Sequence, residues 1–123
     1  MQRTAVIILG IDIKISYYNF SIGVIPQGGN TGLVGGSVPC DNSSIATPVI
    51  LSLSRLNQIE SIDKTSGVVK MGSGCVLEEV DRKCREEAGL MIPIDLGAKG
   101  SCQIGGILST NAGGIRFLRY VLD

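Results

Sequence analysis

The chain reads Pro26-Gln27-Gly28-Gly29-Asn30-Thr31-Gly32 directly after a short run of β-branched residues, and Gly35-Gly36-Ser37 follows. A second glycine-rich stretch begins as Gly97-Ala98-Lys99-Gly100-Ser101-Cys102-Gln103-Ile104-Gly105-Gly106 and ends as Thr110-Asn111-Ala112-Gly113-Gly114. Twelve of the 17 glycines lie in residues 23–36 and 97–114. Glycine weakens helices and strands by about 0.5–1 kcal/mol per residue, so such clustering indicates backbone kept bare for a ligand. Bare N–H groups suit an anion, above all a phosphate.

Composition narrows the possible functions. The chain has 123 residues, enough for one domain, with 44% hydrophobic and 18% charged residues and a formal net charge of +0. Nucleic-acid binders usually show a basic excess, which is absent here, so we expect no nucleic-acid partner. The longest apolar run, residues 5–11, is too short to cross a membrane and is poor as a signal peptide; no transit peptide is visible.

The absence of histidine excludes a Ser-His or Cys-His mechanism, and we predict no catalytic or metal-ligating residue in this chain. The four cysteines show no Cys-x-x-Cys spacing. A zinc site would need four thiolates or carboxylates from scattered positions, so we interpret the cysteines as buried, reduced thiols.

The pattern of apolar residues predicts strands followed by helices. The expected strands are residues 5–11, 14–18, 21–26, a buried strand at 49–53, a hairpin of 58–63 with 68–72 turning at Gly67, and 117–122. Residues 90–93 are expected to be a short strand or an extended connection. Apolar residues at helical spacing predict a helix over 76–88 that ends at Gly89, with ion pairs Glu78–Arg82 and Glu79–Lys83. One or two helical turns are expected over 105–110. We therefore predict an α+β fold.

Two familiar nucleotide motifs do not fit the glycine stretches. Lys99-Gly100-Ser101 has the wrong order for a P-loop, and Leu77 occupies the third glycine position of a Rossmann pattern that begins at Gly72. The alternative without a ligand is a pair of hairpin turns. Asn30 tolerates left-handed backbone and Thr31 offers a hydroxyl, so polar donors accompany the glycines and favour a ligand.

The first stretch resembles the pyrophosphate loop of the flavin-binding domain shared by vanillyl-alcohol oxidase and p-cresol methylhydroxylase. The second stretch, from Pro93-Ile94-Asp95-Leu96 through Arg116-Phe117-Leu118-Arg119-Tyr120, is similar to the mitochondrial D-2-hydroxyglutarate dehydrogenase branch of the FAD-linked D-2-hydroxy acid dehydrogenases. The resemblance covers residues 26–120. It implies a partial two-subdomain FAD-binding domain of the p-cresol methylhydroxylase type, flanked by divergent segments at 1–25 and 121–123.

The resemblance also implies a cofactor site for FAD. Pyrophosphate binding is expected of Gly28, Gly29, Asn30, Thr31 and Gly32. Contacts to the flavin and its ribityl chain are expected of Ser101, Gly105, Gly106, Thr110 and Asn111. Further cofactor-binding residues are expected at Pro26, Gly35, Ser37, Pro93, Gly97 and Gly113.

The implied chemistry is hydride transfer from a D-2-hydroxy acid to flavin N5, giving a 2-oxo acid. The resemblance implies a mitochondrial location, an electron acceptor protein, and substrate binding only in a full-length parent. The family's zinc ligands have no counterpart here, so we expect a fragment that is inactive alone. Two alternatives remain open: an inert or misfolding truncated product, and a stand-alone flavin- or nucleotide-binding module.

Overall fold

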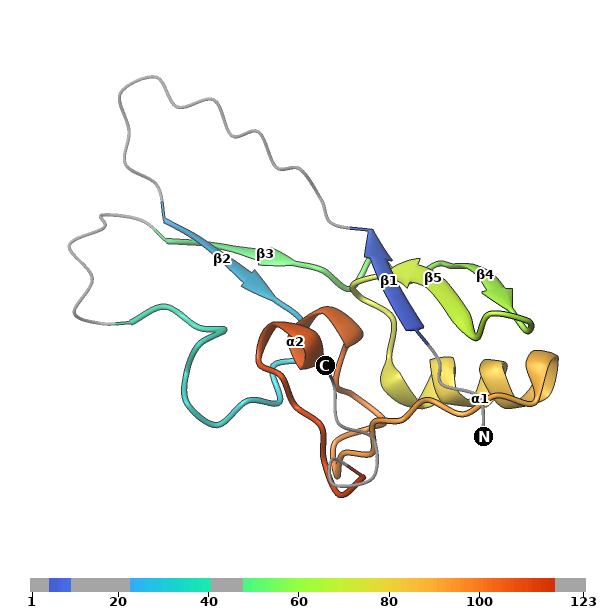
Figure 1. The fold of residues 1–123 in the computed structure, drawn as a ribbon. Helices are drawn as coiled ribbons and strands as arrows, with labels where there is room; N and C mark the ends of the chain where they lie inside the picture. The colour runs from blue at the N-terminus through green and yellow to red at the C-terminus, as the bar shows by residue number, and fades with distance from the viewer. Residues whose placement is uncertain (1–4, 10–22, 41–47, 117–123) are drawn as a thin grey trace.

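The computed structural model describes residues 5–9, 23–40 and 48–116, and combines strands with two helices (Figure 1). The elements are β1 (Ala5–Leu9), β2 (Val24–Gln27), β3 (Val49–Ser52), β4 (Ile59–Asp63), β5 (Val68–Gly72), α1 (Leu77–Ala88) and α2 (Ile104–Ser109). The α+β prediction is confirmed at this level. The expected strands at 14–18 and 117–122, and the start of the one at 21–26, lie outside the described residues.

The strands form two separate sheets. In the first, the order is β1-β5-β4, with β1 parallel to β5 and β4 antiparallel to it. In the second, β2 and β3 pair in parallel from Val24 opposite Val49 to Gln27 opposite Ser52. Helix α1 lies alongside the three-stranded sheet, and the β2–β3 pair extends away from it (Figure 1).

The β4–β5 hairpin turns as the sequence predicts. Gly67 has a φ of 72°, in the left-handed region that glycine adopts without strain. The Asp63 carboxylate accepts hydrogen bonds from the amides of Thr65 at 2.8 Å and Ser66 at 3.3 Å, and from the Ser66 hydroxyl at 2.6 Å. The Ser66 hydroxyl, followed by these amides, lowers the pKa of Asp63 because hydrogen bonds favour the charged form.

Helix α1 begins one residue later than predicted and ends where expected. Val76 is its extended N-terminal cap, and Gly89 ends it with a φ of 67°. The amide of Gly89 donates to the Arg85 carbonyl, and that of Leu90 donates to the Cys84 carbonyl, each at 3.1 Å. The predicted apolar face is buried: Leu77, Val80, Cys84 and Ala88.

The predicted ion pairs of α1 are wrong. Arg82 pairs with Glu86 at 2.9 Å, and Lys83 pairs with Glu87 at 3.8 Å, so each cation pairs with a carboxylate one turn further on. Sequence spacing allows either partner, because residues four positions before and after share the same helix face. Glu78 turns instead toward the loop after α1, where its Oε2 approaches Gly100.

Among the residues whose burial the structure describes, the hydrophobic core lies entirely between residues 69 and 107. It comprises Val69, Met71, Cys75, Leu77, Val80, Cys84, Ala88, Leu90, Ile92, Ile94, Cys102, Ile104 and Ile107. The prediction of a buried strand at 49–53 is wrong in its burial: Val49 is 46% exposed and Ile50 is 45% exposed. In the two-stranded β2–β3 pair, these side chains lack a covering layer within the described chain.

Cysteine burial differs by position. Cys75, Cys84 and Cys102 are buried free thiols, as interpreted from the sequence, whereas Cys40 is exposed. The expectation of burial was therefore wrong for Cys40, which lies in the polar connection after the first glycine stretch and outside the core.

Candidate functional site

The two glycine stretches meet in space although they are far apart in the sequence. A Cβ at Gly29 would overlap the carbonyl oxygen of Ser101 and approach the Cα of Cys102 to 3.2 Å. A Cβ at Gly28 would lie 3.3 Å from the Gln103 side-chain oxygen. Close approach of the two loops therefore requires glycine at position 29, and it forms one candidate site from both stretches.

The loop of the second glycine stretch, called the second loop below, is held by backbone hydrogen bonds to the start of α1 and to the turn before it. The amide of Leu77 donates to Cys102 at 3.1 Å, and that of Glu78 donates to Lys99 at 3.0 Å. The amide of Gly105 donates to Ser73 at 2.8 Å, and a Cβ there would lie 2.7 Å from the Ser73 Cβ. Because α1 belongs to the core, these bonds give the second loop a rigid support.

In the loop of the first glycine stretch, called the first loop below, most backbone amides donate no hydrogen bond. Within the described part of the chain, the N–H groups of residues 28–34 donate no hydrogen bond. Asn30 adopts a left-handed φ of 52°, and its side-chain oxygen accepts a 2.6 Å hydrogen bond from the Ser37 hydroxyl. The Gln27 side chain donates to the Ser37 carbonyl at 2.8 Å, which closes the loop on itself. Residues 26–38 carry no charged side chain, so only neutral dipoles would meet an anion.

The other predicted site residues are spread over both loops and the chain beside them. The Ser101 hydroxyl donates to Ala98 at 3.3 Å, the Thr110 hydroxyl donates to Gly106 at 2.9 Å, and Asn111 has a φ of 53°. Gly32, Gly36, Gly97 and Gly106 have open space where a Cβ would be. Gly35 has a φ of 73°, Pro26 is exposed, and Pro93 and Gly113 are half-buried.

The structure thus brings Gly29 together with Ser101, and Gly28 together with Gln103, but among the described residues no hydrogen bond joins them to the other predicted residues. No hydrogen bond among the described residues joins the first loop to Pro93, Thr110 or Asn111. The roles of the predicted residues in cofactor binding stay predictions.

Sequence reasoning missed Gln103, which is only 7% exposed and lies between two buried apolar residues. Its Nε2 donates to the Ser54 hydroxyl at 3.0 Å, whereas its buried Oε1 has no hydrogen-bond partner among the described residues. Buried polar atoms are nearly always paired in proteins, so an unpaired one suggests a group that a ligand completes. The sequence did show an amide side chain within an apolar stretch flanked by glycines. Which groups that amide contacts could be seen only in the structure.

The buried thiol of Cys102, next to Gln103 in the sequence, is not activated as a nucleophile. Burial raises the pKa of the Cys102 thiol, because desolvation disfavours the thiolate. Cys102 therefore packs as a neutral group at neutral pH. Among the described residues, no three histidine, cysteine, aspartate or glutamate side chains gather closely enough to hold a metal ion.

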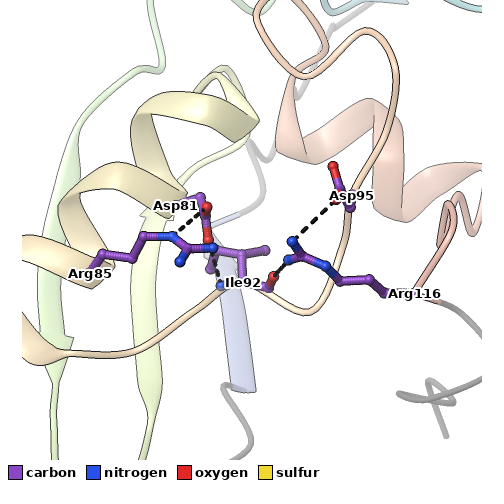
Figure 2. A network of polar contacts seen from close by, with 5 residues as sticks. All are labelled: Asp81, Arg85, Ile92, Asp95 and Arg116. Atoms are coloured by element: carbon purple, nitrogen blue, oxygen red, sulfur yellow. Dashed lines mark hydrogen bonds and ion pairs between the residues drawn. The ribbon is translucent and has the colours of Figure 1, made fainter.

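A hollow of about 550 Å³ lies between α1 and the chain after it. Figure 2 shows Asp81 accepting hydrogen bonds from Arg85 at 2.8 Å and from the Ile92 amide at 2.9 Å. Arg116 donates to the Ile92 carbonyl at 3.3 Å and pairs with Asp95 at 3.1 Å (Figure 2). These contacts tie together two segments that follow α1.

The hollow has a balanced lining of four carboxylates and four cations: Glu78, Glu79, Asp81, Asp95, Arg82, Arg85, Lys99 and Arg116. Arg85 pairs with Asp81, and Arg116 pairs with Asp95. This lining of equal and opposite charges therefore does not favour an anion. Lys99, the single lysine of the glycine stretches, lines this hollow.

Two observations at the junction of the loops bear on the fit of a nucleotide cofactor. The unused amides of the first loop offer donors to a phosphate, and the unpaired Gln103 oxygen, an acceptor, leaves a polar group for a donor to satisfy. A pyrophosphate-bearing cofactor fits the first of these observations, because its oxygens accept hydrogen bonds from free amides.

Comparison with known proteins places the chain in one family. The sequence profile described as the FAD binding domain matches residues 16–122. Two relatives are named mitochondrial D-2-hydroxyglutarate dehydrogenase. That of Rattus norvegicus is 53% identical over 103 residues, covering 84% of this chain and 18% of its own. That of Danio rerio is 53% identical over 112 residues, covering 90% and 20%.

The chain therefore spans about a fifth of the length of these relatives. Among solved structures, an alkyldihydroxyacetonephosphate synthase matches 80% of this chain and 18% of its own with a TM-score of 0.70 and 22% identity. That likeness supports the fold.

Neither of the described helices is long and apolar enough to span a membrane.

Proposed function

The chain belongs to the FAD binding domain family, and on that premise we propose that its two glycine stretches form part of the FAD site of a D-2-hydroxy acid dehydrogenase. FAD is the cofactor of this domain family. The observation that carries the proposal is the contact of Gly29 with the Ser101 carbonyl, beside a loop with unused amides. We also propose that the fold is part of a two-subdomain FAD-binding domain, with residues 26–120 as its portion in this chain.

The first loop is proposed to bind the pyrophosphate. The amides of residues 28–32 offer neutral donors, and the Thr31 hydroxyl is exposed and available to a phosphate oxygen. Gly35 and Ser37 support the loop: the left-handed Gly35 turns the chain, and the Ser37 hydroxyl holds the Asn30 side chain. Close backbone approach favours neutral dipoles over cations here, because the loop contains no charge.

The second loop is proposed to line the flavin and its ribityl chain. Ser101 and Thr110 bring hydroxyls that can rotate away from their carbonyl partners, and Asn111 brings an amide. Gly106 leaves open space for a planar ring, whereas the Gly105 amide is occupied by Ser73. The remaining proposed cofactor-binding residues are Pro26, Pro93, Gly97 and Gly113.

For the whole protein we propose oxidation of D-2-hydroxyglutarate to the 2-oxo acid. When bound, FAD supplies the hydride acceptor: the substrate loses a hydride from its α-carbon and a proton from its hydroxyl. This chain has no histidine, the commonest general base near neutral pH, and we propose that residues outside it take that proton. A mitochondrial location, as in the relatives' names, and an electron acceptor protein complete the proposal.

Two other functions remain as alternatives: an inert product, and a nucleotide-binding module without turnover. FAD binding by the chain excludes the inert alternative. Reduction of a dye acceptor by the FAD-loaded chain with D-2-hydroxyglutarate, above the free-flavin background, would contradict our expectation that this chain alone is inactive.

The test of the proposed site is an FAD titration of the purified chain, followed by quenching of flavin fluorescence. Gly29→Ala should abolish saturable binding, because the added methyl overlaps the Ser101 carbonyl. Gly36→Ala is the matched control in the same loop, since a Cβ there meets nothing within 4 Å. Equal FAD affinity in Gly29→Ala and the unsubstituted chain would contradict the assignment.

A further inference from the structure

Gln103 differs from the other residues of the glycine stretches because its polar side chain is buried. It is the one buried polar side chain of the described residues, and half of its amide is unpaired. Its Oε1 lies against Gly28, at the base of the first loop. The unpaired atom therefore lies next to the loop that is proposed to bind the pyrophosphate.

The Ser54 hydroxyl allows the Gln103 amide to take two orientations. Gln103 now donates from Nε2 to the Ser54 oxygen at 3.0 Å. A hydroxyl both donates and accepts, so after the amide turns over, Ser54 can donate to Oε1 instead. The turn exchanges the two ends of the amide and keeps the hydrogen bond to Ser54.

The two orientations differ in what they present to an anion. The present one directs the carbonyl dipole's negative end toward Gly28, where a pyrophosphate would be repelled. The turned one directs two N–H donors to the same place, and a donor bonded to a charged acceptor makes a stronger hydrogen bond than a neutral pair. An anion at the first loop therefore favours the turned amide.

We propose that Gln103 is a further cofactor-contacting residue: its side-chain amide turns over when FAD binds and donates from Nε2 to the pyrophosphate held by the first loop. Ser54 serves as the pivot, donating to Oε1 in the bound state. The inference rests on the proposed function, and it adds a side-chain donor from the second loop to the backbone donors of the first.

The test combines FAD affinity with the melting temperature of the cofactor-free chain. Gln103→Met has nearly the same shape and no polar atoms. It should raise the FAD dissociation constant about tenfold, the value of one lost hydrogen bond. It should also raise the melting temperature of the cofactor-free chain by a few degrees, because the unpaired buried oxygen is removed.

Gln103→Glu separates donation from acceptance. It keeps oxygen acceptors but loses both N–H groups and adds negative charge, so we expect FAD affinity to fall about a hundredfold or more. Gln58→Met is the matched control, because Gln58 is exposed and contributes its backbone carbonyl to β5 rather than its side chain. It should leave both measurements unchanged.

The outcomes distinguish this inference from the proposed function. If the unsubstituted chain binds no FAD, the proposed function fails and this inference with it. If the unsubstituted chain binds FAD and either Gln103→Met or Gln103→Glu binds equally well, only the inference is overturned. A lower melting temperature in cofactor-free Gln103→Met would also overturn it, because the amide would then serve the Ser54 hydrogen bond alone.

Discussion

The compact part of the chain, residues 59–112, encloses a hydrophobic core, whereas the β2–β3 part, residues 23–38 and 48–52, exposes apolar side chains. Among the residues whose burial is described, 23–40 and 48–116, every buried hydrophobic side chain lies in the compact part. In the β2–β3 part, Leu33 is 99% exposed and Val34 is 95% exposed. Each part contributes one loop to the proposed FAD site, so one half of the site is supported by a core and the other half is not.

This difference teaches where the geometry of the site comes from. The second loop is bonded to α1, whose buried face belongs to the core. The first loop depends on its contact with that second loop and on the pairing of β2 with β3. We therefore expect substitutions of the buried hydrophobic residues of the compact part to act on folding, and substitutions in the first loop to act on ligand binding.

The largest expected effect comes from placing the same charge in each part. Val80 is fully buried in α1, so Val80→Asp should abolish cooperative unfolding: an unpaired buried carboxylate costs several kcal/mol against a net stability of about 5–15 kcal/mol. Val34→Asp, at an exposed position, should change stability by about 0.5 kcal/mol or less. Urea titration followed by circular dichroism measures both, and a cooperative transition in Val80→Asp would break the comparison.

A smaller effect is expected from alkaline pH. Burial raises the pKa of the Cys84 thiol from 9.0 to about 11, with Asp81 and Glu87 adding to the shift. The unfolded chain loses this proton first, so stability should be full below pH 9 and fall between pH 9 and 11, by roughly 2–3 kcal/mol.

The measurement is urea unfolding at pH 8 and pH 11. Cys84→Ala should reduce the pH-dependent loss, with Cys75 and Cys102 accounting for part of the remainder because burial raises their pKa values too. Cys40→Ser, at the exposed cysteine, is the control and should leave the loss unchanged. An identical loss in Cys84→Ala would show that this thiol is not held protonated by the core.

The smallest effect expected comes from single hydrogen-bonding groups. Asp81→Ala removes the carboxylate that accepts from the Ile92 amide and pairs with Arg85, and should cost about 1–3 kcal/mol. Ser37→Ala removes an exposed bond to Asn30 in the β2–β3 part, and should cost about 0.5 kcal/mol or less. Thermal unfolding of the two variants compares them, and equal costs would show that polar contacts stabilise both parts alike.

Local structure was predictable where a short stretch determines it. The helix over 77–88 follows from apolar residues at helical spacing and from Gly89, and the β4–β5 hairpin follows from Gly67. The choice between ion-pair partners before and after Arg82 was not predictable, because both share its helix face. The exposure of Val49 depends on which elements cover β3, and that is a property of the whole arrangement rather than of the strand's composition.

The candidate site was predictable as two stretches but not as a contact map. Clustered glycines with polar neighbours indicate an anion site, and the resemblance to flavin-binding domains predicts that both stretches serve it. The overlap that keeps Gly29 a glycine arises from the Ser101 carbonyl, which spacing along the chain cannot locate. The bond between Gln103 and Ser54, 49 positions apart, is likewise visible only in three dimensions.

The contact between Gly29 and Ser101 also sets an order of events during translation. A ribosome adds about 5–20 residues per second, so Ser101 is made roughly 4 to 14 seconds after Gly29. Throughout that interval the first loop has no second loop to lie against, and α1, which supports the second loop, is itself still being made. A ligand that contacts both loops can therefore bind only after Ser101 has been made, and until then the first loop, with the exposed Leu33 and Val34, lacks its counterpart.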